Sequence, residues 1–147
     1  MGLILDTSIL IADERGKFDM PGFLRQLQSP LVIISAITAA ELLHGIERAP
    51  DPARRARRER HVEHVLASLF VQPFDLDQAR CHARLWAELE MRGQMIGAHD
   101  LQIAAAALAP GHDLATLNVR EFQRVPALHV VDASTFCLTK KLKGGLE

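Results

Sequence analysis

The sequence predicts an α/β fold with a mainly parallel central sheet and helices on both of its faces. Short apolar runs rich in Leu, Ile and Val alternate along the chain with longer stretches of helical periodicity. The apolar runs are hydrophobic at consecutive positions, which is typical of parallel strands that are covered on both faces. The 147 residues fit one domain, and neither a linker nor an internal repeat divides residues 1–147.

The first half of the chain predicts two strands, each followed by helical segments. The apolar run 3–5 predicts a short buried strand, and a helix begins near Ile9 after a polar turn. A proline near its start predicts a helix over 21–28. The mostly β-branched run 31–34 predicts a central parallel strand, and the pattern 38–46 predicts the helix that follows it.

The second half predicts longer helices and three further strands. An apolar stripe that includes Val62 and Val65 predicts a helix over 53–69. In the next helix, Trp86 shares a face with Leu85 and Leu89, which predicts a place in the core or in a dimer interface. The expected elements in this half are helices over 53–69, 77–92 and 100–109, and strands over 70–71, 114–116 and 128–131.

Composition narrows the class of protein. No apolar run approaches the ~20 residues of a membrane helix, and the first residues lack the basic region of a signal peptide. We therefore expect a cytoplasmic protein whose two cysteines, Cys81 and Cys137, are buried thiols rather than a disulfide. The formal net charge of −1 excludes a bulk polycation, and the sequence contains no CxxC, HExxH or P-loop motif.

Four acidic residues lie at the ends of apolar segments, which is a costly place for a charge that neither pairs nor holds a cation. The functional crevice of a parallel sheet lies at the carboxyl ends of its strands, where such side chains can meet. Carboxylate oxygens are the ligands that Mg²⁺ and Mn²⁺ prefer, and such ions activate water for attack on phosphodiesters. The candidate catalytic and metal-binding residues are Asp6, Glu41, Asp100 and Glu121.

Each acid also has a structural explanation of its own. Asp6 could cap a helix or form a turn, and Thr38 with Glu41 fits a capping box. The helix dipole favours Asp100 at a helix start whatever its function, and Glu121 could form a surface ion pair with a nearby arginine. These four explanations are independent, and none of them predicts that all four acids face one crevice.

Four local sequences occur in a fixed order, namely LDTSIL, SAITAAELLHGIE, IGAHDLQIAAAAL and ATLNVREFQRVP. Together they closely resemble the PIN-domain family, and specifically its VapC-type toxin ribonucleases, from Leu3 to about Asp132. The resemblance implies a three-layer PIN-like domain. It also implies metal binding by Asp6, Glu41 and Asp100, with Glu121 or Asn118 completing the site.

The resemblance further implies a function and partners. It implies an endoribonuclease that uses Mg²⁺, for which Mn²⁺ can substitute, and that forms the toxin half of a type II toxin–antitoxin system. A homodimer and inhibition by a VapB-type antitoxin follow from the same resemblance. Thr7, Ser8, Thr116 and Asn118 are expected to support the ligands by hydrogen bonds, although packing at strand ends is the alternative for the two threonines.

The sequence departs from the family pattern at two positions. Ser8 stands where Asn is common, and Leu117 stands where a polar residue is usual, but neither change removes a required acid. Two other functions stay open: a PIN-type nuclease acting on DNA or in RNA processing, and a non-catalytic PIN-like binding module. A haloacid-type phosphatase is disfavoured because its chemistry requires a DxD motif, and Asp6 is followed by Thr-Ser.

An arginine-rich segment and several histidines are secondary candidates. Arg54 and Arg58 lie one helical turn apart and are candidates to bind RNA or an acidic partner, with a solvated helix face as the alternative. His99 is either a phosphate contact or an exposed loop residue. His61 and His64 are expected to line a solvated face, and a short basic tail is expected from about residue 138.

Overall fold

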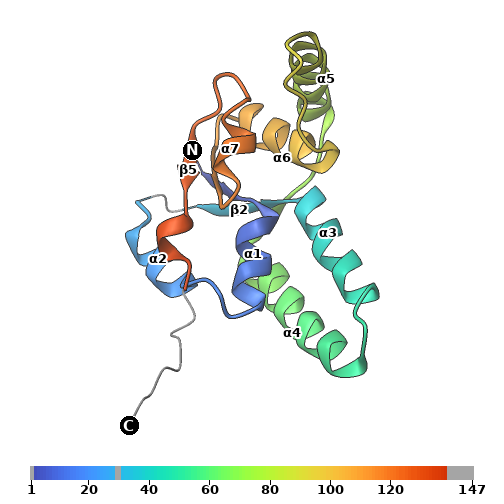
Figure 1. The fold of residues 1–147 in the computed structure, drawn as a ribbon, viewed down its shortest axis with the longest axis vertical. Helices are drawn as coiled ribbons and strands as arrows, with labels where there is room; N and C mark the ends of the chain where they lie inside the picture. Colours follow the sequence, from blue (N-terminus) through green and yellow to red (C-terminus); the bar gives the residue numbers. More distant parts are fainter. Residues whose placement is uncertain (1, 29–30, 139–147) are drawn as a thin grey trace, which may run out of the picture.

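The computed structural model describes residues 2–28 and 31–138, and it places them in three layers (Figure 1). Helices α1 to α4 lie on one side of the sheet, and α5 to α7 lie on the other. This arrangement confirms the predicted α/β fold with helices on both faces. The basic tail predicted beyond Leu138 lies outside the described residues.

The sheet has five strands in the order β3-β2-β1-β4-β5, and all four pairs of neighbours are parallel. The chain builds outward from β1 to β2 and β3, and then returns to the other side of β1 for β4 and β5. The strands are β1 (Leu3–Leu5), β2 (Val32–Ser35), β3 (Phe70–Gln72), β4 (Asp113–Thr116) and β5 (Val130–Asp132).

Alternate residues of the strands supply two separate hydrophobic cores, because successive side chains of a strand point to opposite faces. Ile4, Ile33 and Leu114 belong to the core under α5 and α6. Leu5 and Ile34 belong to the core under α1, α3 and α4. The consecutive apolar residues of β1, β2 and β4 are therefore explained by burial on both sides, as the sequence predicted, whereas the edge strands β3 and β5 are only partly buried.

The first layer contains the helices that follow β1 and β2. They are α1 (Thr7–Glu14), α2 (Met20–Gln26), α3 (Ala36–Glu47) and α4 (Pro52–Ser68). In α4, Val62 and Val65 are buried against the sheet side, while most of the remaining residues are polar and exposed. The predicted stripe of α4 is thus confirmed, with its buried part confined to these two valines.

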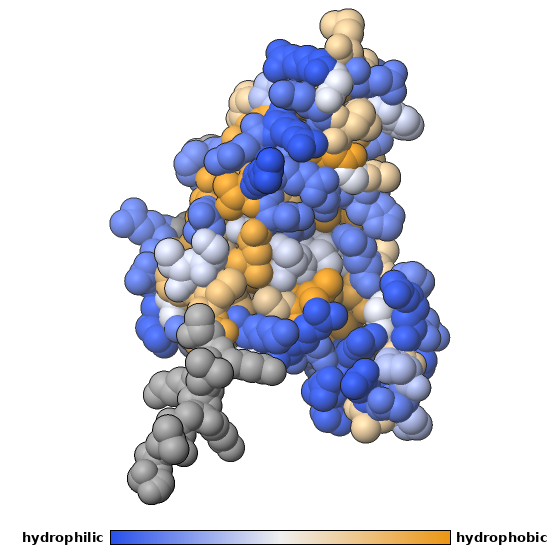
Figure 2. Space-filling model, in the orientation of Figure 1, coloured by the Kyte–Doolittle hydropathy of each residue, from blue (hydrophilic) through white to orange (hydrophobic). Residues whose placement is uncertain are grey.

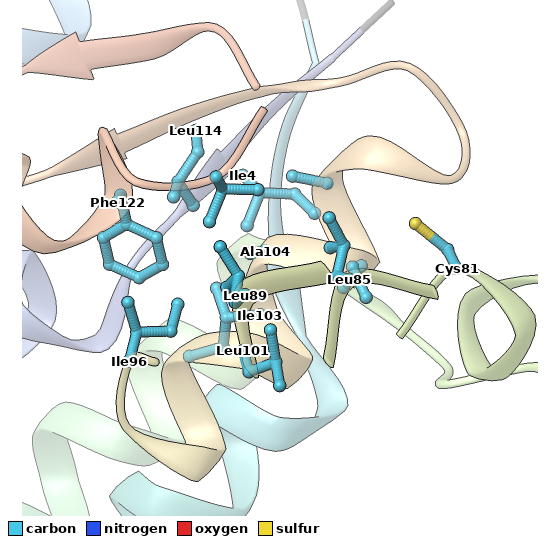
Figure 3. Close-up of a cluster of buried hydrophobic side chains, with 14 of the residues drawn as sticks. Ile4, Cys81, Leu85, Leu89, Ile96, Leu101, Ile103, Ala104, Leu114 and Phe122 are labelled. Carbon is cyan, nitrogen blue, oxygen red and sulfur yellow. The ribbon is translucent and has the colours of Figure 1, made fainter. Parts of the chain in front are cut away.

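The second layer contains α5 (Leu76–Met91), α6 (Ala98–Leu108) and the one-turn helix α7 (Val119–Phe122). Helix α6 lies between the sheet and α5, and its residues Ala104, Ala105, Ala106 and Ala107 have no exposed surface. Figure 3 shows how Leu101 and Ile103 of α6 meet Leu85 and Leu89 of α5, with Ile4 of the sheet nearby. Alanine lets α6 approach its neighbours closely, which fixes the height of its first turn above the sheet.

Four local features differ from the sequence prediction. Cys81 is buried as expected, but Cys137 is exposed, because it follows the 3-10 turn near the end of the described chain. Ser35, rather than Thr38, caps α3, since its hydroxyl accepts a hydrogen bond from the Ile37 amide. Trp86 is not in the core, because half of its surface is exposed. Helix α7 and a 3-10 turn at Ser134–Phe136 were not predicted, since elements of one turn leave no periodic pattern. Among the described residues, no helix has the length and hydrophobicity that a membrane span requires.

Candidate active site

The sheet order reverses between β1 and β4, and both strands lead into the same place. Ligands in open α/β sheets bind outside the carboxyl ends of the strands at such a reversal. Asp6 directly follows β1, and Thr116 is the last residue of β4. Thr116 Oγ1 donates a hydrogen bond of 2.8 Å to Asp6 Oδ2, so the two strand ends are joined through their side chains.

Asp6 is a buried carboxylate, with only 3% of its surface exposed, and hydrogen bonds hold it in a fixed orientation. Its Oδ2 also accepts a hydrogen bond of 2.6 Å from Ser8 Oγ. Asp6 occupies the N-cap position of α1, but its side chain makes no capping hydrogen bond. The helix-cap explanation therefore does not account for the carboxylate, which is instead directed toward the end of β4.

Glu41 extends from the middle of α3 toward the same strand ends. Thr7 Oγ1 donates a hydrogen bond of 2.8 Å to Glu41 Oε1 and lies 3.0 Å from Thr38 Oγ1. The predicted capping box of Thr38 and Glu41 is wrong, because α3 begins before Thr38. His99 Nδ1 approaches Glu41 Oε2 at 3.5 Å from the first turn of α6. Glu41 is thus shared between a buried hydroxyl and an exposed imidazole.

Asp100 lies in the first turn of α6, where it faces the other acids. Burial is the main cause that raises the pKa of Asp100 from its ordinary value of 3.8 to about 7. The negative charges of Asp6, Glu121 and Glu41 also raise the pKa, as does a hydrogen bond with Glu121. The four predicted acids therefore act on one another electrostatically, which is what their separate structural explanations did not predict.

Glu121 stands on α7 and connects this helix to α6. Its Oε1 accepts a hydrogen bond of 2.8 Å from the Gly97 amide, which is the N-cap of α6. Its Oε2 accepts one of 3.2 Å from Asn118 Nδ2. The surface ion pair considered for Glu121 does not form within the described residues. Glu121 holds the helix start that carries Asp100.

The four predicted supporting residues all take part in this network. Besides its bond to Asp6, Thr116 accepts a hydrogen bond of 2.8 Å from the Asn118 amide. Ser8 accepts one of 3.2 Å from the Leu117 amide, so the serine that departs from the family pattern ties the loop after β4 to Asp6. These bonds order the loop that leads to α7.

The donor set suits a hard divalent cation. Carboxylate oxygens are its preferred ligands. Burial first, and then the neighbouring negative charges, raise the pKa of Asp100, and a bound cation would offset both effects. Across residues 2–28 and 31–138, however, no three acidic, histidine or cysteine side chains already form a cluster able to hold an ion. The acids converge, while three of them are bonded to the protein's own hydroxyl and amide groups.

The two secondary arginine candidates separate in the structure. Arg54 is exposed and pairs with Asp51 at 3.5 Å, whereas Arg58 donates a hydrogen bond of 2.7 Å to the Gly45 carbonyl. They therefore do not form one exposed face. His61 is also not solvated, because it lies 3.0 Å from Asp13 and is largely buried, while His64 is exposed as predicted.

Two residues of the site were not predicted. Thr38 is buried beside Thr7, and its position three residues before Glu41 in a helix places both on one face, a signal that was present in the sequence. Gly97 receives Glu121, and a Cβ atom there would lie 3.4 Å from Asp100 Oδ2. Nothing local in the sequence pairs Gly97 with Glu121, which is 24 residues away.

Comparisons with known proteins identify the family to which this fold belongs. A family model described as PIN domain matches residues 3–128. Ribonuclease VapC1 of Rickettsia felis is 37% identical over 135 residues, covering 92% of this chain and 98% of the relative. The tRNA(fMet)-specific endonuclease VapC of Salmonella typhimurium is 32% identical and covers 88% and 96%. The crystal structure of DNA-bound VapBC from Salmonella typhimurium superposes with a TM-score of 0.81, 30% identity, and coverage of 90% and 98%.

Proposed function

This chain belongs to the PIN-domain family, and within it to the VapC group, and on that basis we propose that it is a toxin endoribonuclease. The observation that carries the proposal is the convergence of three carboxylates, Asp6, Glu41 and Glu121, on a fourth, Asp100, whose pKa is raised to about 7. A purely structural acid cluster of this kind would be destabilising without a compensating cation. The proposed substrate is RNA, as it is for the ribonuclease and the tRNA-specific relative described above.

We propose that Asp6, Glu41 and Asp100 would bind Mg²⁺ or Mn²⁺, with Glu121 or Asn118 completing the site. When bound, such an ion lowers the pKa of a coordinated water and stabilises charge on a phosphoryl group. Neighbouring hydroxyl groups of the chain orient the carboxylates. Ser8 and Thr116 hold Asp6, and Thr7 holds Glu41, so these carboxylates need little reorganisation to act.

Glu121 has a second role in the proposed site. Because it accepts the Gly97 amide at the start of α6, it holds the turn from which Asp100 projects. Asn118 in turn holds the second oxygen of Glu121. Glu121 is thus connected to the Asp100 position whether or not it contacts an ion directly.

The proposal includes partners and a location. We propose a cytoplasmic homodimer that is inhibited by a VapB-type antitoxin, since the Salmonella structure is that of a VapBC complex. The half-exposed Trp86 on α5 remains a candidate for the dimer interface. The molar mass of the purified protein, measured by equilibrium sedimentation, tests whether it is a homodimer. The same measurement after addition of the antitoxin encoded by a neighbouring reading frame tests whether the two proteins bind.

Matched RNA and DNA strands of one sequence, incubated with Mg²⁺, test the catalytic proposal. The wild type should cleave the RNA, and Asp100→Asn should not, while Asp77→Asn on the far exposed end of α5 provides the matched control. Cleavage of the DNA alone would favour the alternative of a DNA nuclease. Absence of cleavage of either strand with Mg²⁺ and with Mn²⁺ would favour the non-catalytic binding module.

A further inference from the structure

A cavity of about 840 Å³ lies beside the acid cluster, between α1, α3, α4 and the start of α6. We call it the α3 cavity. Glu41 and His99 line it, so it shares a wall with the candidate active site. Figure 2 shows hydrophobic surface between α1 and α3 with hydrophilic side chains around it, and Ile11 and Ile37 contribute apolar lining.

The charge of the α3 cavity is mainly positive. Arg15, Arg48 and Arg58 line it, and within the described part of the chain none of the three has a carboxylate within ion-pair distance. The acids in the lining are Glu41, which belongs to the active site, and Glu14, which pairs with Arg57 at 3.1 Å. Three arginine charges therefore face the cavity without neutralisation.

The other arginines of α4 provide the contrast. Arg54, Arg55 and Arg57 pair with Asp51, Glu47 and Glu14, respectively, and none of them is among the residues that line the cavity. Arg58 differs because its Nη1 is fixed by the Gly45 carbonyl at 2.7 Å, which directs the guanidinium toward α3. Arg60 is exposed and also lies outside the cavity, so Arg58 is the one arginine of α4 that lines it.

We infer, on the basis of the proposed function, that the RNA strand at the acid cluster continues into the α3 cavity, where Arg15, Arg48 and Arg58 bind its backbone phosphates. Guanidinium groups match phosphate oxygens in geometry and charge. The apolar lining offers a surface for the sugar and base faces. Phosphate contacts carry no sequence information, so the cavity supplies affinity and orientation rather than sequence choice.

The test compares two double variants that remove the same charge. Arg15→Gln with Arg48→Gln changes two exposed residues of the cavity, and Arg54→Gln with Arg60→Gln changes two exposed residues outside it. The probe is a fluorescein-labelled single-stranded RNA of mixed sequence, titrated in EDTA across a range of KCl concentrations. We expect the cavity variant to flatten the log–log salt slope by up to about 1.4, at about 0.7 per lost contact, and the control to leave it unchanged.

The KM and kcat of RNA cleavage with Mg²⁺ provide a second test of the same variants. Contacts remote from the cleaved bond that bind substrate and transition state equally raise KM and leave kcat unchanged. The cavity variant should therefore raise KM several-fold at constant kcat. A fall in kcat with unchanged KM would contradict a role in phosphate binding.

The outcomes separate this inference from the proposed function. If the wild type cleaves RNA and both double variants show equal slopes, the inference is wrong and the ribonuclease stands. If the cavity variant binds RNA normally but loses affinity for a purified antitoxin, the cavity is a protein contact and the inference is again wrong. If the wild type neither binds nor cleaves RNA, both proposals fail together.

Discussion

Thr116 and Asp6 come from strands that are 110 residues apart in sequence, and a single hydrogen bond of 2.8 Å joins their side chains. Thr116 has no exposed surface, and its hydroxyl also accepts the Asn118 amide. One hydroxyl thus orients a candidate metal ligand and orders the loop that leads to α7.

Thr116→Val should lower both stability and cleavage. Valine keeps the shape of threonine but leaves the Asn118 amide without its side-chain acceptor and leaves Asp6 with Ser8 as its remaining hydroxyl donor. We expect a loss of about 1–3 kcal/mol in the free energy of unfolding, measured by urea denaturation, together with reduced RNA cleavage. Thr116→Ser retains the hydroxyl and is the control. Equal damage from both changes would indicate that the methyl group, not the hydrogen bond, matters.

The raised pKa of Asp100 predicts a pH dependence in the metal-free protein. Since the folded-state pKa of about 7 lies above the ordinary value of 3.8, the group favours folding most below about pH 4, and this contribution is lost as pH rises toward 7. Asp100→Asn removes the titration. In EDTA, the Tm of the wild type should fall relative to that of the variant between pH 4 and pH 7. Parallel Tm profiles would contradict the assigned pKa.

Divalent metal should stabilise the folded protein without being needed for folding. Binding to the native state alone raises the free energy of unfolding by about 2.7 kcal/mol when the metal is present at 100 times its Kd. We expect a higher Tm with Mg²⁺ or Mn²⁺ and a folded, inactive protein in EDTA. Asp6→Asn and Glu41→Gln should each shrink the Tm increase and abolish cleavage. Unfolding in EDTA would instead indicate a structural metal.

Two substitutions at Glu121 should differ in effect. Glu121→Gln keeps an oxygen that can accept the Gly97 amide, so cleavage should fall less than it does in Asp100→Asn. Glu121→Ala removes that acceptor and releases the start of α6, so the loss should be larger. The cleavage rates of the two variants, measured under saturating Mg²⁺, show whether the hydrogen bond to Gly97 or the charge of Glu121 matters. Equal inactivity of both variants would assign Glu121 a direct, charge-dependent role.

Much of the fold was predictable because the three central strands are buried on both sides and each major helix carries a clear pattern. The meeting of Asp6 with the end of β4 was predictable because residues at the carboxyl ends of neighbouring parallel strands lie at one edge of the sheet. The hydrogen-bond partner of each individual polar residue was harder to predict. Ser35 and Thr38 are both good helix caps, and the position of β2 decided in favour of Ser35.

Charge pairing was the least predictable property of the site. Arg54 and Arg58 are equivalent in sequence, but Arg54 has a carboxylate three residues before it, while Arg58 finds the Gly45 carbonyl across the α3–α4 junction. Similarly, the side-chain partner of His61 is Asp13, which is 48 residues away in sequence. Such contacts depend on how helices pack, and no local pattern records them.

The alanines inside α6 have a consequence for genetic escape from toxicity. A larger side chain at Ala104 or Ala106 has no free space and should push α6 away from the elements that pack against it, at a cost of about 1–3 kcal/mol. The displaced helix carries Asp100 with it. If cells that express this chain are selected for survival, loss-of-function changes should therefore accumulate at these alanines as well as at the acids, although the alanine side chains touch no substrate.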